Sequence, residues 1–225
     1  MKLIAVETAT EACSAALLMD GEVTERFEIA PRQHTQLILP MVDQLLSDAG
    51  LKPTDLDGLA FGRGPGAFTG VRIATGVIQG LAFAADLPVA PISTLAAMAY
   101  GEYKKREQSN ILTAIDARMG EIYWAGYQFS DTGEMRELIA EQVVPAIEAP
   151  LPESNKWLGV GSGFQSDGEI LAERLSDLLI GTDAALLPRA ADIAMLAAPV
   201  IEKGEGVSAA NALPIYLRDQ VVHKS

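Results

Sequence analysis

Short apolar runs and helical apolar stripes alternate along the first half of the chain. Continuous or alternating runs of β-forming residues predict strands, and apolar residues that recur every three or four positions predict amphipathic helices. The strands are expected at residues 3–6, 14–19, 23–29, 58–61 and 89–92. The helices are expected at residues 35–49, 69–85 and 95–104. Asp20-Gly21 predicts a hairpin turn, and Pro40 predicts a first-turn kink or a later start in the first helix.

A similar order of elements returns in the second half. Strands are expected at residues 111–115, 121–129, 135–144 and 157–160, and helices near residues 167–179 and 190–203. The order strand-strand-strand-helix-strand-helix therefore occurs twice, with a division near residues 108–110. This duplication predicts an α/β protein of the ribonuclease-H-like, actin/hexokinase (ASKHA) type. Its two lobes, residues 1–108 and 109–225, would face a cleft.

Composition and charge narrow the function. The chain has 225 residues, 49% of them hydrophobic, which excludes a disordered protein. Its 17 Lys and Arg against 30 Asp and Glu give a net charge of −13, so a phosphate backbone would repel it. If the protein acts on a nucleic acid, we therefore expect a partner protein to make the contact. One cysteine and no signal-peptide or membrane-span pattern predict a cytoplasmic protein without disulfides.

Each half begins with a strand that ends on an acid, Glu7 or Asp116. Ligands of open α/β sheets bind at the carboxyl ends of strands, where such acids could hold Mg²⁺ and a nucleotide phosphate. The residues of such a nucleotide cleft would be Glu7, Thr8, Thr10, Gly64, Asp116 and Arg118. Neither strand end is followed by the early glycine that lets a phosphate approach. We therefore interpret the cleft as vestigial, and the acids could equally cap backbone N–H groups.

The glycine-rich loop at residues 61–70 fails the phosphate-binding patterns. Ala67 breaks G-x-G-x-x-G, and the loop contains no lysine for a P-loop. These departures favour a tight strand-to-helix turn that lets the following helix pack closely.

The sequence also contains no pattern that supports nucleophilic catalysis or metal-dependent catalysis. Ser162 stands in the wrong register for a nucleophile elbow, and neither His34 nor His223 is placed for a triad. Cys13 enters a strand and is interpreted as a small buried thiol. No H-x-x-x-H or H-E-x-x-H pattern occurs, so we predict neither a catalytic residue nor a metal site.

The helix at residues 69–85 carries two glycines, Gly76 and Gly80, away from its apolar stripe. Glycine inside a helix costs up to about 1 kcal/mol relative to alanine, so close approach of another backbone would explain both. Internal packing against the sheet is the alternative. We favour a partner interface formed by Leu39, Arg72, Gly76, Gln79, Gly80 and Phe83.

Four segments together resemble the TsaB (YeaZ) family over nearly the whole chain. They are IAVETATEACS at 4–14, GRGPGAFTGVRI at 62–73, IDARMGEIY at 115–123 and LPIYLR at 213–218. The resemblance implies a non-catalytic subunit of tRNA N6-threonylcarbamoyladenosine (t6A) modification that scaffolds and activates the TsaD transferase with TsaE. It implies pairing with TsaD or with a second copy through the N-terminal lobe, and contact with tRNA only through the complex.

The departures from TsaD imply that this chain lacks transferase chemistry. TsaD carries an H-x-x-x-H metal pair, and here Thr94 and Met98 stand at those positions. No cofactor is then required, although weak ATP or ADP binding stays open. A nucleotide-binding, kinase-like enzyme of the same fold is the alternative function, motivated by Glu7 and Asp116. A peptidase is disfavoured, because no nucleophile–base pair is apparent.

Overall fold

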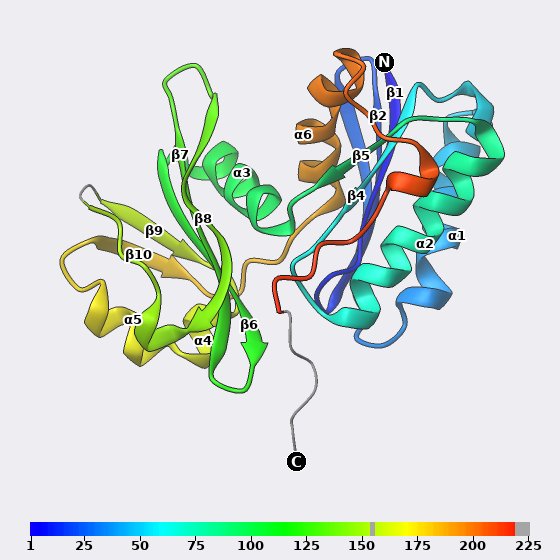
Figure 1. The fold of residues 1–225 in the computed structure, drawn as a ribbon. Coiled ribbons are helices and arrows are strands. Elements are labelled where there is room, and N and C mark those ends of the chain that lie inside the picture. The colour runs from blue at the N-terminus through cyan, green and yellow to red at the C-terminus, as the bar shows by residue number, and fades with distance from the viewer. Residues whose placement is uncertain (154–155, 219–225) are drawn as a thin grey trace. The chain divides into compact units, whose positions relative to one another are not determined.

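The computed structural model describes residues 1–153 and 156–218, so His223 lies outside the described residues. The chain forms two compact units (Figure 1). The first unit contains Met1–Ala97 and Pro188–Pro214, and the described residues of the second lie within Met98–Leu187 and 215–218. Each unit is built on one five-stranded sheet.

The sheet of the first unit has the order β3-β2-β1-β4-β5. Its strands are β1 (Lys2–Glu7), β2 (Ala12–Met19), β3 (Glu22–Ile29), β4 (Gly58–Gly62) and β5 (Val89–Ile92). β1, β2 and β3 form an antiparallel meander, and β4 and β5 extend it in parallel. The predicted hairpin at Asp20-Gly21 is confirmed, since both residues have positive φ.

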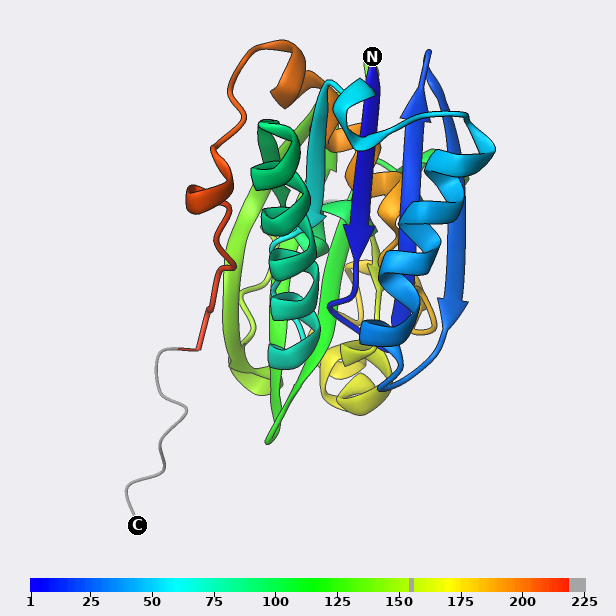
Figure 2. The ribbon, with the colours of Figure 1, turned by 90° about the vertical axis from the view of Figure 1, so that its right-hand side faces the viewer.

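Helices cover both faces of this sheet (Figures 1 and 2). α1 (His34–Asp48) and α2 (Phe68–Ala85) lie on one face, and α6 (Ala190–Glu202) lies on the other. Successive side chains of a strand point to opposite faces, so Ile4 pairs with the first group of helices and Leu3 with α6. By length and composition α2 could cross a membrane, but its apolar stripe is buried in this core. α1 begins at His34 and continues through Pro40, so the later start is not observed.

The sheet of the second unit has the order β10-β9-β6-β7-β8. Its strands are β6 (Asn110–Arg118), β7 (Glu121–Phe129), β8 (Met135–Pro145), β9 (Trp157–Val160) and β10 (Leu179–Asp183). Its helices are α4 (Gly163–Ser166), α5 (Gly168–Arg174) and most of α3 (Thr94–Arg106). Three short 3₁₀ helices complete the described chain: η1 (Pro53–Asp55), η2 (Ala146–Glu148) and η3 (Ala209–Asn211). Trp124 and Trp157 are fully buried at the centre of this unit.

The two sheets repeat one plan. In each, a central strand (β1 or β6) pairs with an antiparallel meander on one side and with parallel strands on the other. This topology confirms the duplicated ribonuclease-H-like, actin/hexokinase type of fold.

Two expectations for the second half are wrong in detail. The segment expected as one helix at residues 167–179 forms α5, a turn and the start of β10. The apolar β-forming pair Leu179-Ile180 pairs with β9 instead of continuing the helix. The last helix, α6, packs on the first sheet, because its stripe of small side chains fits against Leu3, Ala5 and Ala16. The compact units therefore differ in extent from the predicted lobes of residues 1–108 and 109–225.

Side chains of the first sheet fix the start of α6. The Glu25 carboxylate accepts hydrogen bonds from Arg189 Nε at 2.9 Å and from the Ala191 N–H at 3.0 Å. The Ser14 hydroxyl accepts one from the Ala190 N–H at 3.0 Å. The first N–H groups of a helix have no intrahelical acceptor, so the sheet supplies the cap that Arg189, the N-cap residue, does not provide.

Replacing Glu25 by Ala should lower the free energy of unfolding by roughly 1–3 kcal/mol, because Arg189 and a helix N–H lose their acceptor. Urea unfolding at pH 7 measures the change. Glu22→Ala removes an exposed carboxylate from the same strand and should change stability by less than about 0.5 kcal/mol. Equal effects of the two substitutions would contradict the capping role.

Candidate functional site

Glu7 ends β1 and is completely buried in the first unit. Its Oε1 accepts a hydrogen bond from the Ala9 N–H at 2.5 Å, and its Oε2 accepts one from the Thr94 hydroxyl at 3.1 Å. A Cβ atom at Gly62 would lie 1.9 Å from Oε2. The carboxyl therefore fills the space above the end of β4, and both of its oxygens are engaged by the chain itself.

Burial controls the charge of this group. Desolvation raises the pKa of the Glu7 carboxyl from 4.5 to about 7, although hydrogen bonds from Ala9, Thr94 and Thr8 oppose the rise. The low-dielectric interior disfavours the ionised form more than these donors favour it. The protein thus carries an acid that titrates near neutral pH.

The glycine-rich loop packs on the segment after β1. The Thr8 hydroxyl donates to the Gly70 carbonyl at 2.7 Å, and the Ala67 N–H donates to the Ala9 carbonyl at 2.7 Å. A Cβ at Gly70 would lie 2.0 Å from the Thr8 carbonyl oxygen. The glycines at this contact serve the close approach of two chain segments, as the tight-turn interpretation predicts.

Gly64 also contributes to the packing between the glycine-rich loop and its neighbours in the first unit. Its φ is +94°, and its carbonyl accepts the Thr94 N–H at 3.0 Å. The Thr10 carbonyl lies 2.9 Å from His34 Nε2, and the Ala12 carbonyl lies 3.2 Å from the same nitrogen. Because both carbonyls are acceptors, Nε2 carries the proton and His34 ties the segment to the start of α1.

Cys13 is fully buried in β2. Burial, together with the nearby charges of Glu28 and Glu7, raises the pKa of its thiol to about 11. A thiol with that pKa stays protonated at neutral pH and is a poor nucleophile.

The second predicted acid, Asp116, caps its own turn in the second unit. Its Oδ1 accepts the Arg118 N–H at 2.7 Å, and its Oδ2 pairs with the Arg118 guanidinium at 2.7 Å. Its own N–H donates to the Ser162 hydroxyl at 3.0 Å. Of the predicted cleft residues, Asp116 and Arg118 therefore meet each other. Glu7, Thr8, Thr10 and Gly64 gather separately in the first unit.

Thr94 and Met98, for which the resemblance implied the positions of the TsaD histidine pair, lie on α3, and both side chains are buried. The Thr94 hydroxyl is used on Glu7. Within residues 1–153 and 156–218 no group of three or more His, Cys, Asp or Glu side chains could hold a metal ion. A hydroxyl and a thioether are also unsuited to replace two imidazoles around such an ion.

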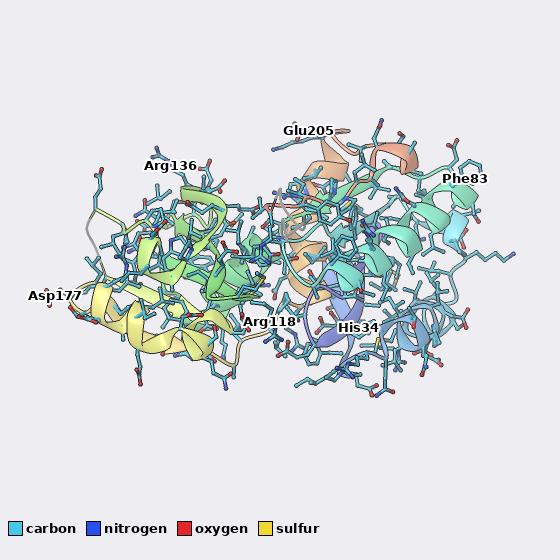
Figure 3. All side chains as sticks on the ribbon, turned by 60° about the horizontal axis from the view of Figure 1, so that its bottom comes forward. His34, Phe83, Arg118, Arg136, Asp177 and Glu205 are labelled. Carbon is cyan, nitrogen blue, oxygen red and sulfur yellow. The ribbon has the colours of Figure 1, made fainter. Side chains whose placement is uncertain are left out.

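The predicted interface residues lie on or beside the outer surface of α2. Gly76 and Gly80 are exposed, and an added Cβ at either would meet nothing within 4 Å. Phe83 is 85% exposed at the outer end of the helix (Figure 3), and Leu39 is 51% exposed on neighbouring α1. The sheet does not use these glycines, so internal packing does not explain them.

Two details of this surface escape the sequence pattern. Phe68 is also exposed, and the Arg72 guanidinium carbon stacks 3.5 Å from the centre of its ring. Gln79 turns toward the chain itself and donates to the Ala212 carbonyl at 3.0 Å. An aromatic residue within the glycine-rich segment 61–70 was a usable sequence signal for Phe68, whereas the Gln79 contact spans 133 residues of sequence.

Fold and site define an actin/hexokinase-like α/β protein whose strand-end acids are engaged by the chain's own groups. A family model described as "TsaD: tRNA N6-adenosine threonylcarbamoyltransferase" matches residues 27–224. The tRNA threonylcarbamoyladenosine biosynthesis protein TsaB of Escherichia coli (strain K12) is 44% identical, covering 100% of this chain and 97% of that protein. The chain belongs to the TsaB (YeaZ) family of tRNA threonylcarbamoyladenosine biosynthesis proteins.

Other relatives agree. TsaB of Haemophilus influenzae is 42% identical, covering 100% of this chain and 96% of that protein. The solved structure of YeaZ from Pseudomonas aeruginosa superposes with a TM-score of 0.86 at 44% identity, covering 96% of this chain and 99% of that one. A structure described as an uncharacterized protein with similarity to peptidase YEAZ from the same organism has a TM-score of 0.89 at 46% identity. It covers 96% of this chain and 99% of that one.

Replacing Glu7 by Gln should stabilise the protein at pH 8 and leave it almost unchanged at pH 4.5. A folded-state pKa above the unfolded value means that stability is lost as pH rises from 4.5 through about 7. One pKa unit corresponds to about 1.4 kcal/mol, so the gain at pH 8 should reach roughly 3 kcal/mol. Urea unfolding across pH 4.5–8 measures it, with exposed Glu11→Gln as the control. Parallel pH profiles for wild type and Glu7→Gln would contradict the buried-acid assignment.

Gly70→Ala and Gly80→Ala should have opposite effects. An alanine at position 70 collides with the Thr8 carbonyl and should cost roughly 1–3 kcal/mol, as overpacking does. An alanine at position 80 meets open space and should stabilise the helix by about 0.5–1 kcal/mol. Thermal unfolding of both variants measures the difference. Destabilisation by Gly80→Ala would show that the glycine serves the fold.

Proposed function

We propose that this chain is a non-catalytic subunit of t6A modification that scaffolds and activates a TsaD-type transferase together with TsaE. The outer surface of α2 carries this proposal. Gly76 and Gly80 leave its backbone open, and the large side chain of Phe83 is almost fully exposed beside them. Glycines permit close approach of another helix, and buried aromatic side chains are frequent anchors of protein interfaces.

The non-catalytic role is supported by the residues at the strand ends. Both oxygens of Glu7 accept hydrogen bonds from the chain, and Asp116 is paired with Arg118. By the resemblance to TsaD, Thr94 and Met98 stand where its metal-binding pair would be, and both are buried. A nucleotide-binding, kinase-like enzyme would need an acid that faces its ligand, so this alternative is less well supported. A peptidase would need an activated nucleophile, and Cys13 is a buried, protonated thiol.

The partners follow from the family and the charge. TsaD and TsaE homologues are the proposed partners, and a second copy of this chain could use the same α2 surface. The net charge of −13 disfavours direct binding of the tRNA backbone, so tRNA would be contacted through the basic surfaces of the complex. The proposed location is the cytoplasm, where tRNA is modified.

Replacing Phe83 by Glu should weaken the complex with the TsaD-type protein of the same organism by about 100-fold or more, as loss of an interface anchor does. Titration calorimetry measures the affinity, and reconstituted t6A formation on tRNA should fall in parallel. The fold should be unaffected, because Phe83 is exposed.

Ile147→Glu supplies the matched control. Ile147 is 57% exposed in η2 of the second unit and is not part of the α2 surface, and its substitution should leave both measurements at the wild-type value. Full t6A formation without this chain would overturn the subunit role. Unchanged affinity of Phe83→Glu would overturn the α2 surface as the interface.

A further inference from the structure

A groove of about 400 Å³ lies at the C-terminal end of α2. Phe83, Asp86 and Leu87 form one wall, and the segment 206–210 forms the other. Figure 2 shows this C-terminal segment and η3 beside α2, on the side away from α1. Apolar and polar groups contribute about equally to its surface: Leu87 and Val207 are among the apolar side chains, and Asp86 supplies the single carboxylate.

The walls of the groove are held in place by hydrogen bonds within the first unit. Val89 and Val207 exchange two backbone hydrogen bonds of 2.8 Å each. Gln79 on α2 donates to the Ala212 carbonyl, which anchors the chain just beyond the groove. Gly206 also packs tightly, since a Cβ there would lie 2.9 Å from Pro88. The groove is therefore formed before any partner binds, which reduces the entropy lost on binding.

Asp86 occupies an unfavourable position for the free chain. It is the C-cap residue of α2 with a φ of +53°, a conformation usually given to glycine or asparagine. The C-terminal end of a helix carries partial negative charge, so a carboxylate there is repelled. Among residues 1–153 and 156–218, no side-chain hydrogen bond or ion pair compensates this charge. A cation in the groove would be attracted by both the carboxylate and the helix end.

We propose that this groove binds a lysine or arginine side chain of the TsaD-type partner, with its charged end at Asp86 and its aliphatic stem against Leu87 and Val207. Long basic side chains combine an apolar stem with a charged tip, which matches a groove that offers apolar side chains beside one acid. The groove continues the interface proposed above, because Phe83 belongs to both surfaces. This inference rests on the proposed function.

The test is Asp86→Asn, which removes the charge and keeps a residue that tolerates positive φ. Affinity for the purified TsaD-type protein of the same organism should fall about 5- to 10-fold at 0.1 M salt, and the difference should shrink to less than about 2-fold at 1 M salt. Asp86→Lys should bind more weakly still. Meanwhile the melting temperature of the isolated Asp86→Asn variant should stay level or rise by about 1–3 °C, because an unfavourable charge leaves the helix end.

Glu173→Gln is the control, because it removes an exposed carboxylate from α5 in the second unit. Its affinity should match that of the wild type at both salt concentrations. Wild-type affinity of both Asp86 variants would overturn the groove assignment, while the loss caused by Phe83→Glu would keep the proposed function. A wild-type chain that does not bind the TsaD-type protein would overturn both.

Discussion

The contact between the segment after β1 and the glycine-rich loop determines much of the first unit. Gly62 leaves room for the Glu7 carboxyl, and Gly70 lets the start of α2 touch the Thr8 carbonyl. Thr94, the first residue of α3, is held at this contact by hydrogen bonds to the Glu7 carboxyl and the Gly64 carbonyl. The contact also has a cost in stability above neutral pH. Ionising the buried Glu7 carboxyl is unfavourable, because the carboxylate has lost its hydration. Loop glycines that resemble a phosphate cradle here serve internal packing.

The helix α2 uses glycine for two different physical purposes. Gly70 faces the core side, where any side chain would collide with the backbone of Thr8. Gly76 and Gly80 face outward, where a side chain would meet nothing. The fold requires the first glycine. The outer two lower the stability of the helix, and no contact within the described chain explains their presence. These destabilising outer glycines and the exposed side chain of Phe83 are the physical basis for assigning this surface to a partner.

The negative charge of the chain affects which molecules it can bind in the proposed complex. The chain is strongly acidic as a whole, so it adds no attraction for a tRNA backbone. The same charge favours basic protein surfaces as neighbours. Asp86 is a local instance, because its carboxylate lies at the negative end of α2 and lacks a compensating cation within the described residues. Acidic character thus favours protein contacts over nucleic acid contacts.

The sequence by itself determined the strands of both sheets except β10, the hairpins, the main helices and the duplicated plan. These follow from local periodicity and turn residues, which act over a few positions. It also identified Glu7, Asp116 and the outer residues of α2 as notable. Only the tertiary structure decided that α6 packs on the first sheet, that the Thr94 hydroxyl meets Glu7, and that residues 206–210 complete a groove beside Asp86. Those facts depend on contacts between segments far apart in the chain, and no local pattern encodes which surfaces will meet.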